Sequence, residues 1–372
     1  MVSLRERRFN DATLVDSVGE LMGGAERVLL VPPDFTRLHS FAGDIVNLLM
    51  GAFGDQVVGV LPATGTHRPM TDEELRTMYG EVPRALIRDR DWRSTAERVA
   101  ELSRSEVREW SDGLFDEIVP VEVDRALLDP SIDLIVSLSQ VLPHEVVGMS
   151  GHAKNLLVGA GGPSMVNVSH YLGALVGIEE VLGRLDTPPR RLLEHAMERI
   201  NCLLPRVGYV HLVVGSDPAD PTRRAPIGWY CGDDITPYHL AARHSQRENI
   251  TVLDEPVDRA VVILDPQVYQ STWLANKAIY RTRMAIRDGG ELIIVAPGLS
   301  HFGEDQRADA LIRRVGYHGR EHALRMMRID PELGGERSVV AHSLHGSSEG
   351  RFSTSYATQR LTKEELRGVG FD

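Results

Sequence analysis

The stretch "PHEVVGMSGHAKNLLVGAGG", residues 143–162, places an unusual group of side chains in a run that is otherwise mostly small or apolar. Lys154 is its only lysine or arginine, and His144, His152 and Glu145 are its other ionisable residues. A glycine-rich turn at the end of a strand commonly binds a phosphate. A lysine flanked by histidines in such a turn makes this stretch a candidate functional site.

Polar side chains also follow three other apolar runs in the chain. In open α/β sheets, ligands bind at the carboxyl ends of the strands, so such residues are candidates for one active site. The segments are "PDFTR", "ATGTHRP" and "QVYQSTW", and their candidate residues are Asp34, Thr36, Arg37, His67, Arg68, Tyr269, Gln270 and Trp273.

The elements that must position these residues alternate between short apolar runs and helical patterns. Helices between strands predict a parallel sheet with helical cover, the α/β class. One expected helix, "TDEELRTMYG", opens with a capping box from Thr71 to Glu74 and ends at Gly80. The other expected helix is "SFAGDIVNLLMGAFG", and the expected strands are "ERVLLVPPD", "QVVGVLPATG", "EIVPVEVD", "IDLIVSLSQ" and "YVHLVVG".

A domain boundary is predicted within "RENITVLDEPVD", residues 247–258, because the alternation restarts beyond it. The segments "RAVVILDP", "ELIIVAPG" and "RSVVAHSL" are the expected strands there, with "YQSTWLANKAIYRTRMAIRDGG" as a helix. We expect two α/β domains with mostly parallel sheets, residues 1–250 and 251–372, with the last residues free to return to the first domain. The active site is expected in the cleft between them.

Composition narrows the class of protein. The 372 residues carry a formal net charge of −12, which disfavours binding to nucleic acid or to an anionic membrane. The two cysteines, Cys202 and Cys231, give neither a disulfide framework nor a metal motif. The N-terminal stretch is charged where a signal peptide is apolar, and no apolar run is long enough to span a bilayer. We expect a cytoplasmic protein.

Each candidate residue also has a structural interpretation. Asp34 and Thr36 could cap the following helix, and Arg37 could belong to a surface ion pair. Tyr269 and Trp273 could be core residues of a helix.

The turn "GAGGPS" offers a different function, because it partly matches the dinucleotide-binding pattern GxGxxG. Gly159 and Gly161 fit that pattern, but Ser164 stands at the third glycine position. A nicotinamide-dependent dehydrogenase that uses the Gly159–Ser164 turn therefore remains an alternative.

Taken together, five motifs resemble the nickel-dependent lactate racemase family. They are "DFTR", "TGTHRPMTDEEL", "PHEVVGMSGHAK", "SHYLG" and "YQST". His144, Lys154 and His170 also follow one another in the family's order, at intervals of ten and then sixteen residues. The resemblance covers most of residues 30–175 and a shorter patch around residues 265–280.

The resemblance implies a nickel pincer nucleotide as cofactor, bound by the first domain. Lys154 matches the lysine that tethers it through a thioamide, and His170 matches the nickel ligand. His67 and His144 match the histidines that act as acid and base on opposite faces of the substrate. The other residues implied in cofactor binding are Asp34, Thr36, Ser150, Gly151 and Tyr269, and those implied in substrate binding are Arg37, Gln270 and Trp273.

The implied activity is racemisation or epimerisation of a 2-hydroxy acid by proton-coupled hydride transfer to and from the cofactor. Gln270 matches a family residue, but Trp273 stands where the lactate enzyme has a lysine near the substrate carboxylate. This departure favours a substrate larger than lactate. The expected partners are a small 2-hydroxy acid and, transiently, the enzymes that build the cofactor. A non-catalytic nickel- or nucleotide-binding protein is a further alternative.

Overall fold

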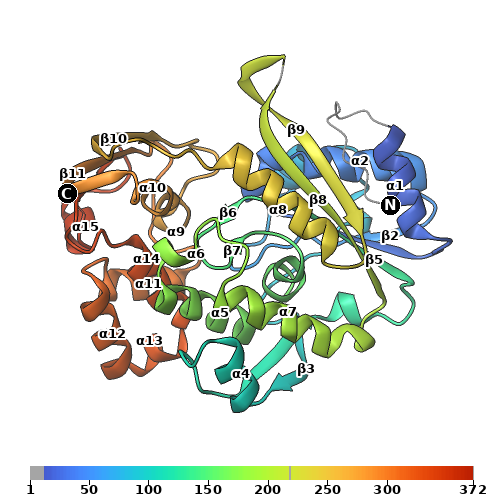
Figure 1. Cartoon of the computed structure of the whole chain (residues 1–372), viewed down its shortest axis with the longest axis horizontal. Helices are drawn as coiled ribbons and strands as arrows, with labels where there is room; N and C mark the ends of the chain where they lie inside the picture. The colour runs from blue at the N-terminus through green and yellow to red at the C-terminus, as the bar shows by residue number, and fades with distance from the viewer. Residues whose placement is uncertain (1–11, 218, 372) are drawn as a thin grey trace. The chain divides into compact units, whose positions relative to one another are not determined.

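The computed structural model describes residues 12–217 and 219–371, and the chain divides into two compact units (Figure 1). The first unit comprises Met1–Val166 and Leu182–Ile250, and the second comprises Asn167–Val181 and Thr251–Asp372. The division at residues 250/251 lies within the segment where the sequence predicts a boundary. Residues 167–181, however, group with the second unit.

The first unit is built on a five-stranded sheet with the strand order β2-β1-β5-β8-β9. The first four of these strands are parallel, and β9 pairs antiparallel with β8. The α/β class is therefore confirmed. The strands are β1 (Val28–Val31), β2 (Val57–Val60), β5 (Leu134–Gln140), β8 (Arg206–Asp217) and β9 (Asp220–Gly232).

One predicted strand lies outside this sheet. The segment "EIVPVEVD" forms β4 (Val119–Asp124), which pairs antiparallel with β3 (Ala96–Leu102) as a separate ribbon. A second small ribbon joins β6 (Pro143–His144) to β7 (Gly148–Met149). Both ribbons lie in segments that carry or support candidate site residues.

Helices pack on both faces of the main sheet. On one face, a core that includes Leu30, Val136 and Leu212 packs with α1 (Ala12–Met22) and α2 (Ala42–Phe53). On the other face, Val213 and Tyr238 belong to a core with α8 (Thr236–Asn249). The remaining helices of this unit are η1 (Phe35–Ser40), α3 (Asp72–Tyr79), η2 (Arg84–Leu86), α4 (Arg104–Trp110), η3 (Arg125–Leu128), η4 (Asn155–Gly159), α7 (Pro188–Ile200) and η5 (Asn201–Leu203).

The second unit has a three-stranded parallel sheet, β10-β11-β12. Its strands are β10 (Val257–Ile263), β11 (Ile286–Val295) and β12 (Ser353–Ala357). Helix α5 (Pro163–Val176) crosses the division, and most of it belongs here. The other helices are α6 (Ile178–Val181), α9 (Thr272–Ala275), α10 (Lys277–Thr282), α11 (Gln306–Val315), α12 (Arg320–Ile329), α13 (Pro331–Gly335), α14 (Arg337–Gly346) and α15 (Lys363–Gly368).

The expected strand at "RSVVAHSL" is wrong, because this segment forms helix α14. All residues from Ser338 to Gly346 are buried, so this part of the helix has no exposed face to give the sequence a clear helical period. The third strand follows instead at β12. Within the described parts of the chain, no helix combines the length and apolarity needed to cross a membrane.

The capping box on α3 gives a stability prediction. The Thr71 hydroxyl accepts the Glu74 N–H, and the Glu74 carboxylate accepts the Thr71 N–H at 2.8 Å, as the sequence predicts. Thr71→Ala is therefore expected to lower the free energy of unfolding by about 1 kcal/mol. Urea unfolding measures this effect. Thr77→Ala, an exposed substitution within the same helix, is the matched control, and equal losses in both variants would contradict the assignment.

Candidate active site

The turn that carries His67 follows β2. Gly65 adopts a left-handed conformation, φ +59°, and its N–H donates to the Gly159 carbonyl at 2.8 Å. The His67 N–H donates to the Thr64 carbonyl at 3.0 Å, which closes the turn. Because Gly159 ends the helix that follows Lys154, these hydrogen bonds connect the backbone of the His67 turn to the segment after the lysine.

His67 forms a carboxylate–histidine pair with Asp34. Its Nδ1 lies 2.7 Å from Asp34 Oδ2, and the Thr36 hydroxyl donates to Asp34 Oδ1 at 2.6 Å. Asp34 is only 3% exposed. Burial raises the pKa of this carboxyl, but the charge and hydrogen bond of His67, the Thr36 hydrogen bond and the charge of Arg37 together hold the pKa below its ordinary value.

This pair determines the chemistry available to His67. A carboxylate only accepts hydrogen bonds, so Nδ1 carries a proton and the neutral ring has its lone pair on Nε2. That is the arrangement of a histidine base oriented by a carboxylate. The helix-cap interpretation of Asp34 is wrong, because its side chain makes no capping bond to η1.

A buried arginine supports the same turn. Arg90 donates from Nη1 to the Thr64 hydroxyl at 2.9 Å and from Nη2 to the Gly161 carbonyl, and its Nε lies 3.5 Å from Asp124 Oδ2. Burial lowers the pKa of Arg90 to about 10, against the opposing charges of nearby aspartates, so the guanidinium remains charged at neutral pH. Arg90 is not among the predicted site residues, because nothing in "RDRDW" distinguishes it from a surface arginine.

His144 has the opposite hydrogen-bonding arrangement to His67. It ends β6, is 5% exposed, and its Nδ1 accepts the backbone N–H of Val146 at 3.1 Å. A ring nitrogen that accepts carries no proton, so the neutral ring of His144 holds its proton on Nε2. The two predicted acid–base histidines therefore differ in which ring nitrogen is protonated.

Ser150 and Gly151 form the turn that leads to Lys154. The Ser150 hydroxyl donates to the Gln140 carbonyl at 2.7 Å and accepts the Leu142 N–H at 3.0 Å, which ties the turn to the end of β5. Gly151 has φ +96°, and a Cβ atom there would lie 2.9 Å from Ser139 Oγ. Only glycine combines this conformation with this close approach. The predicted contacts of both residues with a cofactor remain predictions.

Lys154 stands immediately before η4, a buried π-helical turn in which the Ala160 N–H donates to the Asn155 carbonyl at 2.9 Å. The Asn155 amide donates to the Val31 carbonyl, the Ser137 hydroxyl and the Leu138 carbonyl at 3.0, 2.9 and 3.2 Å. Short π-helical turns are frequent at functional sites. Asn155, which is not among the predicted site residues, thus connects the lysine turn to the end of β1 and the middle of β5.

Lysine is rare in this chain. Only three lysines occur, Lys154, Lys277 and Lys363, against 38 arginines (41 basic residues less three). Arginine supplies positive charge equally well but lacks a nucleophilic amine at neutral pH. A half-buried lysine on a glycine-rich turn is thus suited to covalent attachment.

The remaining predicted residues are distributed between the units. Arg37 belongs to the first unit, where it is half-buried beside Thr36. His170 lies half-buried on α5 in the second unit, and its Nδ1 is 3.4 Å from the Ser169 hydroxyl. The residues of the second unit implied in cofactor or substrate binding are Tyr269, Gln270 and Trp273.

Two of these residues have well-defined surroundings in the second unit. The Gln270 amide donates to the Gln267 carbonyl at 3.1 Å. The indole of Trp273 stacks on His342, with ring centroids 4.6 Å apart. The two ring nitrogens of His342 lie 2.7 and 2.8 Å from the hydroxyls of Tyr280 and Tyr317, so the surface beneath the indole is fixed.

The Gly159–Ser164 turn lacks the context of a dinucleotide site. It follows a π-helical turn rather than a strand, and the first free N–H of α5, that of Ser164, donates to Glu122 Oε2 at 2.8 Å. A carboxylate therefore stands where a dinucleotide fold binds a phosphate. A Cβ on Gly161 would lie 1.7 Å from the Leu157 carbonyl oxygen, so close packing explains that glycine.

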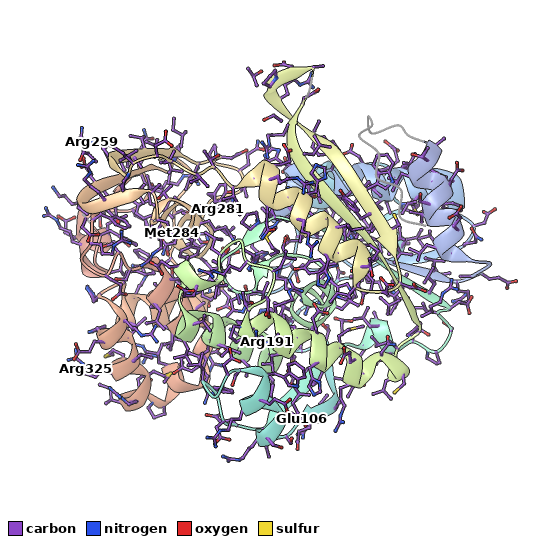
Figure 2. The ribbon with its side chains drawn as sticks, viewed as in Figure 1. Glu106, Arg191, Arg259, Arg281, Met284 and Arg325 are labelled. Carbon is purple, nitrogen blue, oxygen red and sulfur yellow. The ribbon has the colours of Figure 1, made fainter. Side chains whose placement is uncertain are left out.

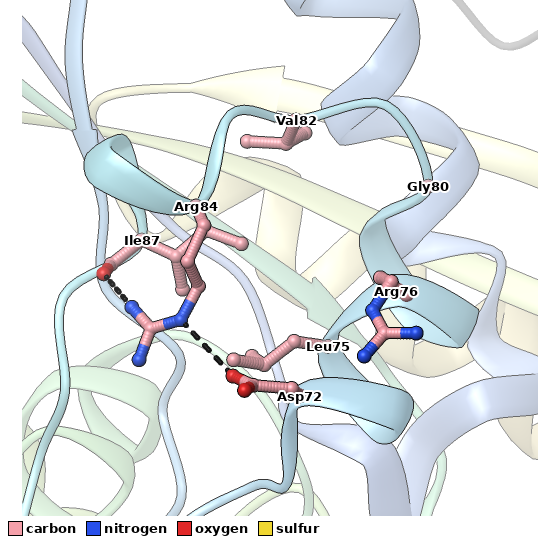
Figure 3. A pocket seen from close by; sticks show the side chains of 7 residues that line it. All are labelled: Asp72, Leu75, Arg76, Gly80, Val82, Arg84 and Ile87. Atoms are coloured by element: carbon pink, nitrogen blue, oxygen red, sulfur yellow. Dashed lines mark hydrogen bonds and ion pairs between the residues drawn. The ribbon is translucent and has the colours of Figure 1, made fainter.

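A surface hollow of about 290 Å³ lies elsewhere in the first unit (Figure 3). It is bordered by α3 and η2, and Arg84 there donates to the Ile87 carbonyl at 2.9 Å. None of the predicted site residues lines it; its residues are Asp72, Leu75, Arg76, Gly80, Val82, Arg84 and Ile87.

Comparison with known proteins agrees with the motifs. Residues 10–181 match the family described as the lactate racemase N-terminal domain. Over 168 residues the chain is 25% identical to the lactate racemase of Lactiplantibacillus plantarum, a match that spans 44% of this chain and 37% of that protein. The predicted resemblance to the lactate racemase family is thus confirmed.

Solved structures share the fold over nearly the whole chain. A crystal structure of a Thermotoga maritima protein superposes with a TM-score of 0.84 at 24% identity, covering 96% of this chain and 89% of that one. The lactate racemase apoprotein of Thermoanaerobacterium thermosaccharolyticum gives a TM-score of 0.69 at 18% identity, covering 99% of this chain and 86% of that one. At these identities the likeness concerns the fold.

The Asp34–His67 pair predicts a pH dependence of stability. Because the pKa of Asp34 is lowered in the folded chain, its carboxylate stabilises the fold above the ordinary pKa of 3.8, and this stabilisation is lost as the pH falls below 3.8. Asp34→Asn is expected to unfold about 1–3 kcal/mol more easily at pH 7, with a smaller difference below about pH 4. Urea titrations at several pH values measure the difference. Asp44→Asn, exposed on α2, is the control; a deficit independent of pH would contradict the assignment.

Proposed function

We propose that this chain is a racemase or epimerase of a 2-hydroxy acid that works with a nickel pincer nucleotide. The observation that carries the proposal is the Asp34–His67 pair, which holds a histidine base on the strand-end turn that also contacts the segment after Lys154. The match of residues 10–181 to the family described as the lactate racemase N-terminal domain supports it. When bound, the cofactor would accept the α-hydrogen of the substrate as hydride and return it.

In this proposal His67 removes the proton from the substrate hydroxyl. Its Nε2 lone pair accepts that proton, and the buried Asp34 carboxylate stabilises the imidazolium that forms. His144 offers Nε2–H to a substrate oxygen. For His144 to take up a proton at Nδ1, the hydrogen bond from the Val146 N–H must first break. Before the reaction, Nε2 of His67 therefore carries a lone pair, whereas Nε2 of His144 carries a proton.

The groups that would hold the cofactor suit it chemically. Lys154 supplies the amine for a thioamide, and His170 supplies a half-buried imidazole for nickel. No cluster of three or more His, Cys, Asp or Glu side chains within residues 12–217 and 219–371 could hold a metal by itself. A metal bound mainly by an organic cofactor needs only one such protein ligand.

Trp273 supports a substrate larger than lactate. Its indole rests on His342, which two tyrosine hydroxyls hold in place, so it would offer a firm apolar surface rather than a charge. Arg37 would then bind the substrate carboxylate, because its planar guanidinium matches the two oxygens.

The two alternatives have less support. A dehydrogenase that uses the Gly159–Ser164 turn would have to displace the Glu122 carboxylate from the start of α5. A protein that only stores nickel or a nucleotide has no need of a histidine base oriented by a buried carboxylate.

Two variants test the attachment of the cofactor. In protein produced together with the cofactor-building enzymes, Lys154→Ala is expected to lose the covalent adduct seen by intact mass spectrometry in the unmodified chain. His170→Ala is expected to keep the adduct but to bind less nickel, because one imidazole ligand is removed. Lys363→Ala, exposed on α15, is the control and should keep both. A full adduct on the Lys154→Ala variant would rule out the tether.

Substrate preference can be measured with a panel of chiral 2-hydroxy acids in deuterated water. Every 2-hydroxy acid lacks the charge-assisted hydrogen bond that a lysine would give its carboxylate, and only a larger acid can recover that loss by contact with the Trp273 indole. Lactate is therefore expected to react about 10- to 150-fold less efficiently than larger acids. Because hydride is returned, the product should retain α-hydrogen. Extensive deuterium at the α-carbon would instead indicate simple deprotonation.

Substitutions of Trp273 sharpen the same experiment. Trp273→Lys restores a positive charge and should shift preference toward lactate, whereas Trp273→Leu removes the indole without adding charge and should not. Lactate as the best substrate of the unmodified chain would contradict the proposed role of Trp273.

A further inference from the structure

His152, two residues before Lys154, adopts a backbone conformation that side chains usually avoid. Its φ is +54°, directly after Gly151 at φ +96°. For a residue with a Cβ this left-handed conformation costs about 1–2 kcal/mol. Specific contacts must therefore hold the turn, and they come from the His152 side chain and from helix α7.

The His152 ring is held on two sides within the first unit. Its Nδ1 lies 2.7 Å from Glu194 Oε2, and its plane stacks on Tyr209 with centroids 4.2 Å apart. Burial raises the pKa of Glu194, but the hydrogen bond and charge of His152 and the charge of Arg190 lower it further, so Glu194 is a carboxylate. His152 therefore donates Nδ1–H to Glu194.

Arg190 holds the backbone of the same turn. It is 3% exposed, and its Nη1 donates to the Gly151 carbonyl at 3.1 Å and to Glu194 Oε1 at 2.8 Å, while its Nη2 donates to the Met149 carbonyl. The guanidinium also lies over the Tyr238 ring, 4.6 Å from its centroid. One buried arginine thus binds the carbonyls on both sides of Ser150 and the carboxylate that holds His152.

We propose that His152, Glu194 and Arg190 form a positioning network that fixes the Gly151–His152 turn and so restricts where the Lys154 amine can lie. Its importance for cofactor attachment rests on the proposed function. The restriction of Lys154 itself does not, because every contact in the network belongs to the protein.

Acylation of lysine in cofactor-free protein tests the network. N-hydroxysuccinimidyl acetate is the probe, and peptide mass spectrometry gives the ratio of labelling rates at Lys154 and at the exposed Lys363. His152→Gly keeps the left-handed backbone but removes the donor to Glu194. Glu194→Gln replaces one of the two carboxylate oxygens with an amide group that donates. One of the two donors, His152 Nδ1–H or Arg190 Nη1–H, therefore loses its acceptor. In both variants the ratio should rise about fivefold, as the turn opens on losing one ordinary hydrogen bond.

Two further variants separate this role from general loss of stability. His152→Asn should keep the ratio of the unmodified chain, because asparagine tolerates the left-handed conformation and its Nδ2 stands where the imidazole Nδ1 stands. His195→Asn is the matched control on the same helix. It removes a histidine–carboxylate contact of 3.1 Å to Glu106, which lies on α4 (Figure 2), and should leave the ratio unchanged.

The proposal is overturned if the His152→Gly and Glu194→Gln variants label Lys154 at the ratio of the unmodified chain, or if His152→Asn labels it as fast as His152→Gly. Should His152→Gly fail to fold, as circular dichroism would reveal, Glu194→Gln and His152→Asn decide the question. Absence of any adduct on the unmodified chain, with the expected labelling pattern intact, would remove the proposed function and leave the network standing.

Discussion

The candidate site of the first unit depends on one buried charge, the guanidinium of Arg90. It binds the turn that carries His67, the glycine segment that follows Lys154, and Asp124 at the end of the β3–β4 ribbon. These segments are far apart in sequence and lie outside the main parallel sheet, so the sheet's own hydrogen bonds cannot align them. A buried arginine without its acceptors would carry a severe desolvation penalty, which means that the segments are held together or the region does not form.

The two predicted acid–base histidines illustrate how backbone and side chains set chemical roles. Asp34 accepts a hydrogen bond from Nδ1–H of His67, which leaves a lone pair on Nε2 of that ring. The Val146 N–H donates to Nδ1 of His144, which leaves the proton of that ring on Nε2. A reaction that moves a proton from one face of a substrate to the other requires one acceptor and one donor at the outset. The hydrogen bonds that His67 and His144 make before the reaction are compatible with one histidine acting as the acceptor and the other as the donor.

The sequence predicted much of this arrangement because chemistry-bearing residues follow strands. The main strands, the helix at 42–53 and the capped helix at 72–79 were all predicted from local patterns, which are strong where one face is apolar and the other polar. Helix α14 was mistaken for a strand because it is buried all round. The β3–β4 ribbon depends on pairing between separate segments, which local patterns do not encode. Strand β9 forms a hairpin with β8, but its first residues, 221–224, are exposed, so it lacks a continuous apolar run.

Site residues were predicted less completely, for a related reason. Asp34 was expected to contact the cofactor, and that contact is untested; its contact with His67, 33 residues away, depends on β1 and β2 being neighbours. Arg90, Arg190 and Glu194 stand in ordinary charged segments, and only the fold makes them neighbours of the two functional turns. Composition and spacing identify groups that react, whereas the groups that orient them are defined by tertiary contacts.

The path of the chain through its two units has a consequence for synthesis and assembly. The first unit is interrupted by residues 167–181, whose partners include Arg283, Arg320 and Ser338 more than a hundred residues later. As the chain emerges from the ribosome, α5 is synthesised before the C-terminal third of the protein, which supplies those partners. The helix bearing His170 is thus completed late, after the turn bearing Lys154 can already have formed. A chain cut at residue 250 would retain that helix without the side chains that hold it.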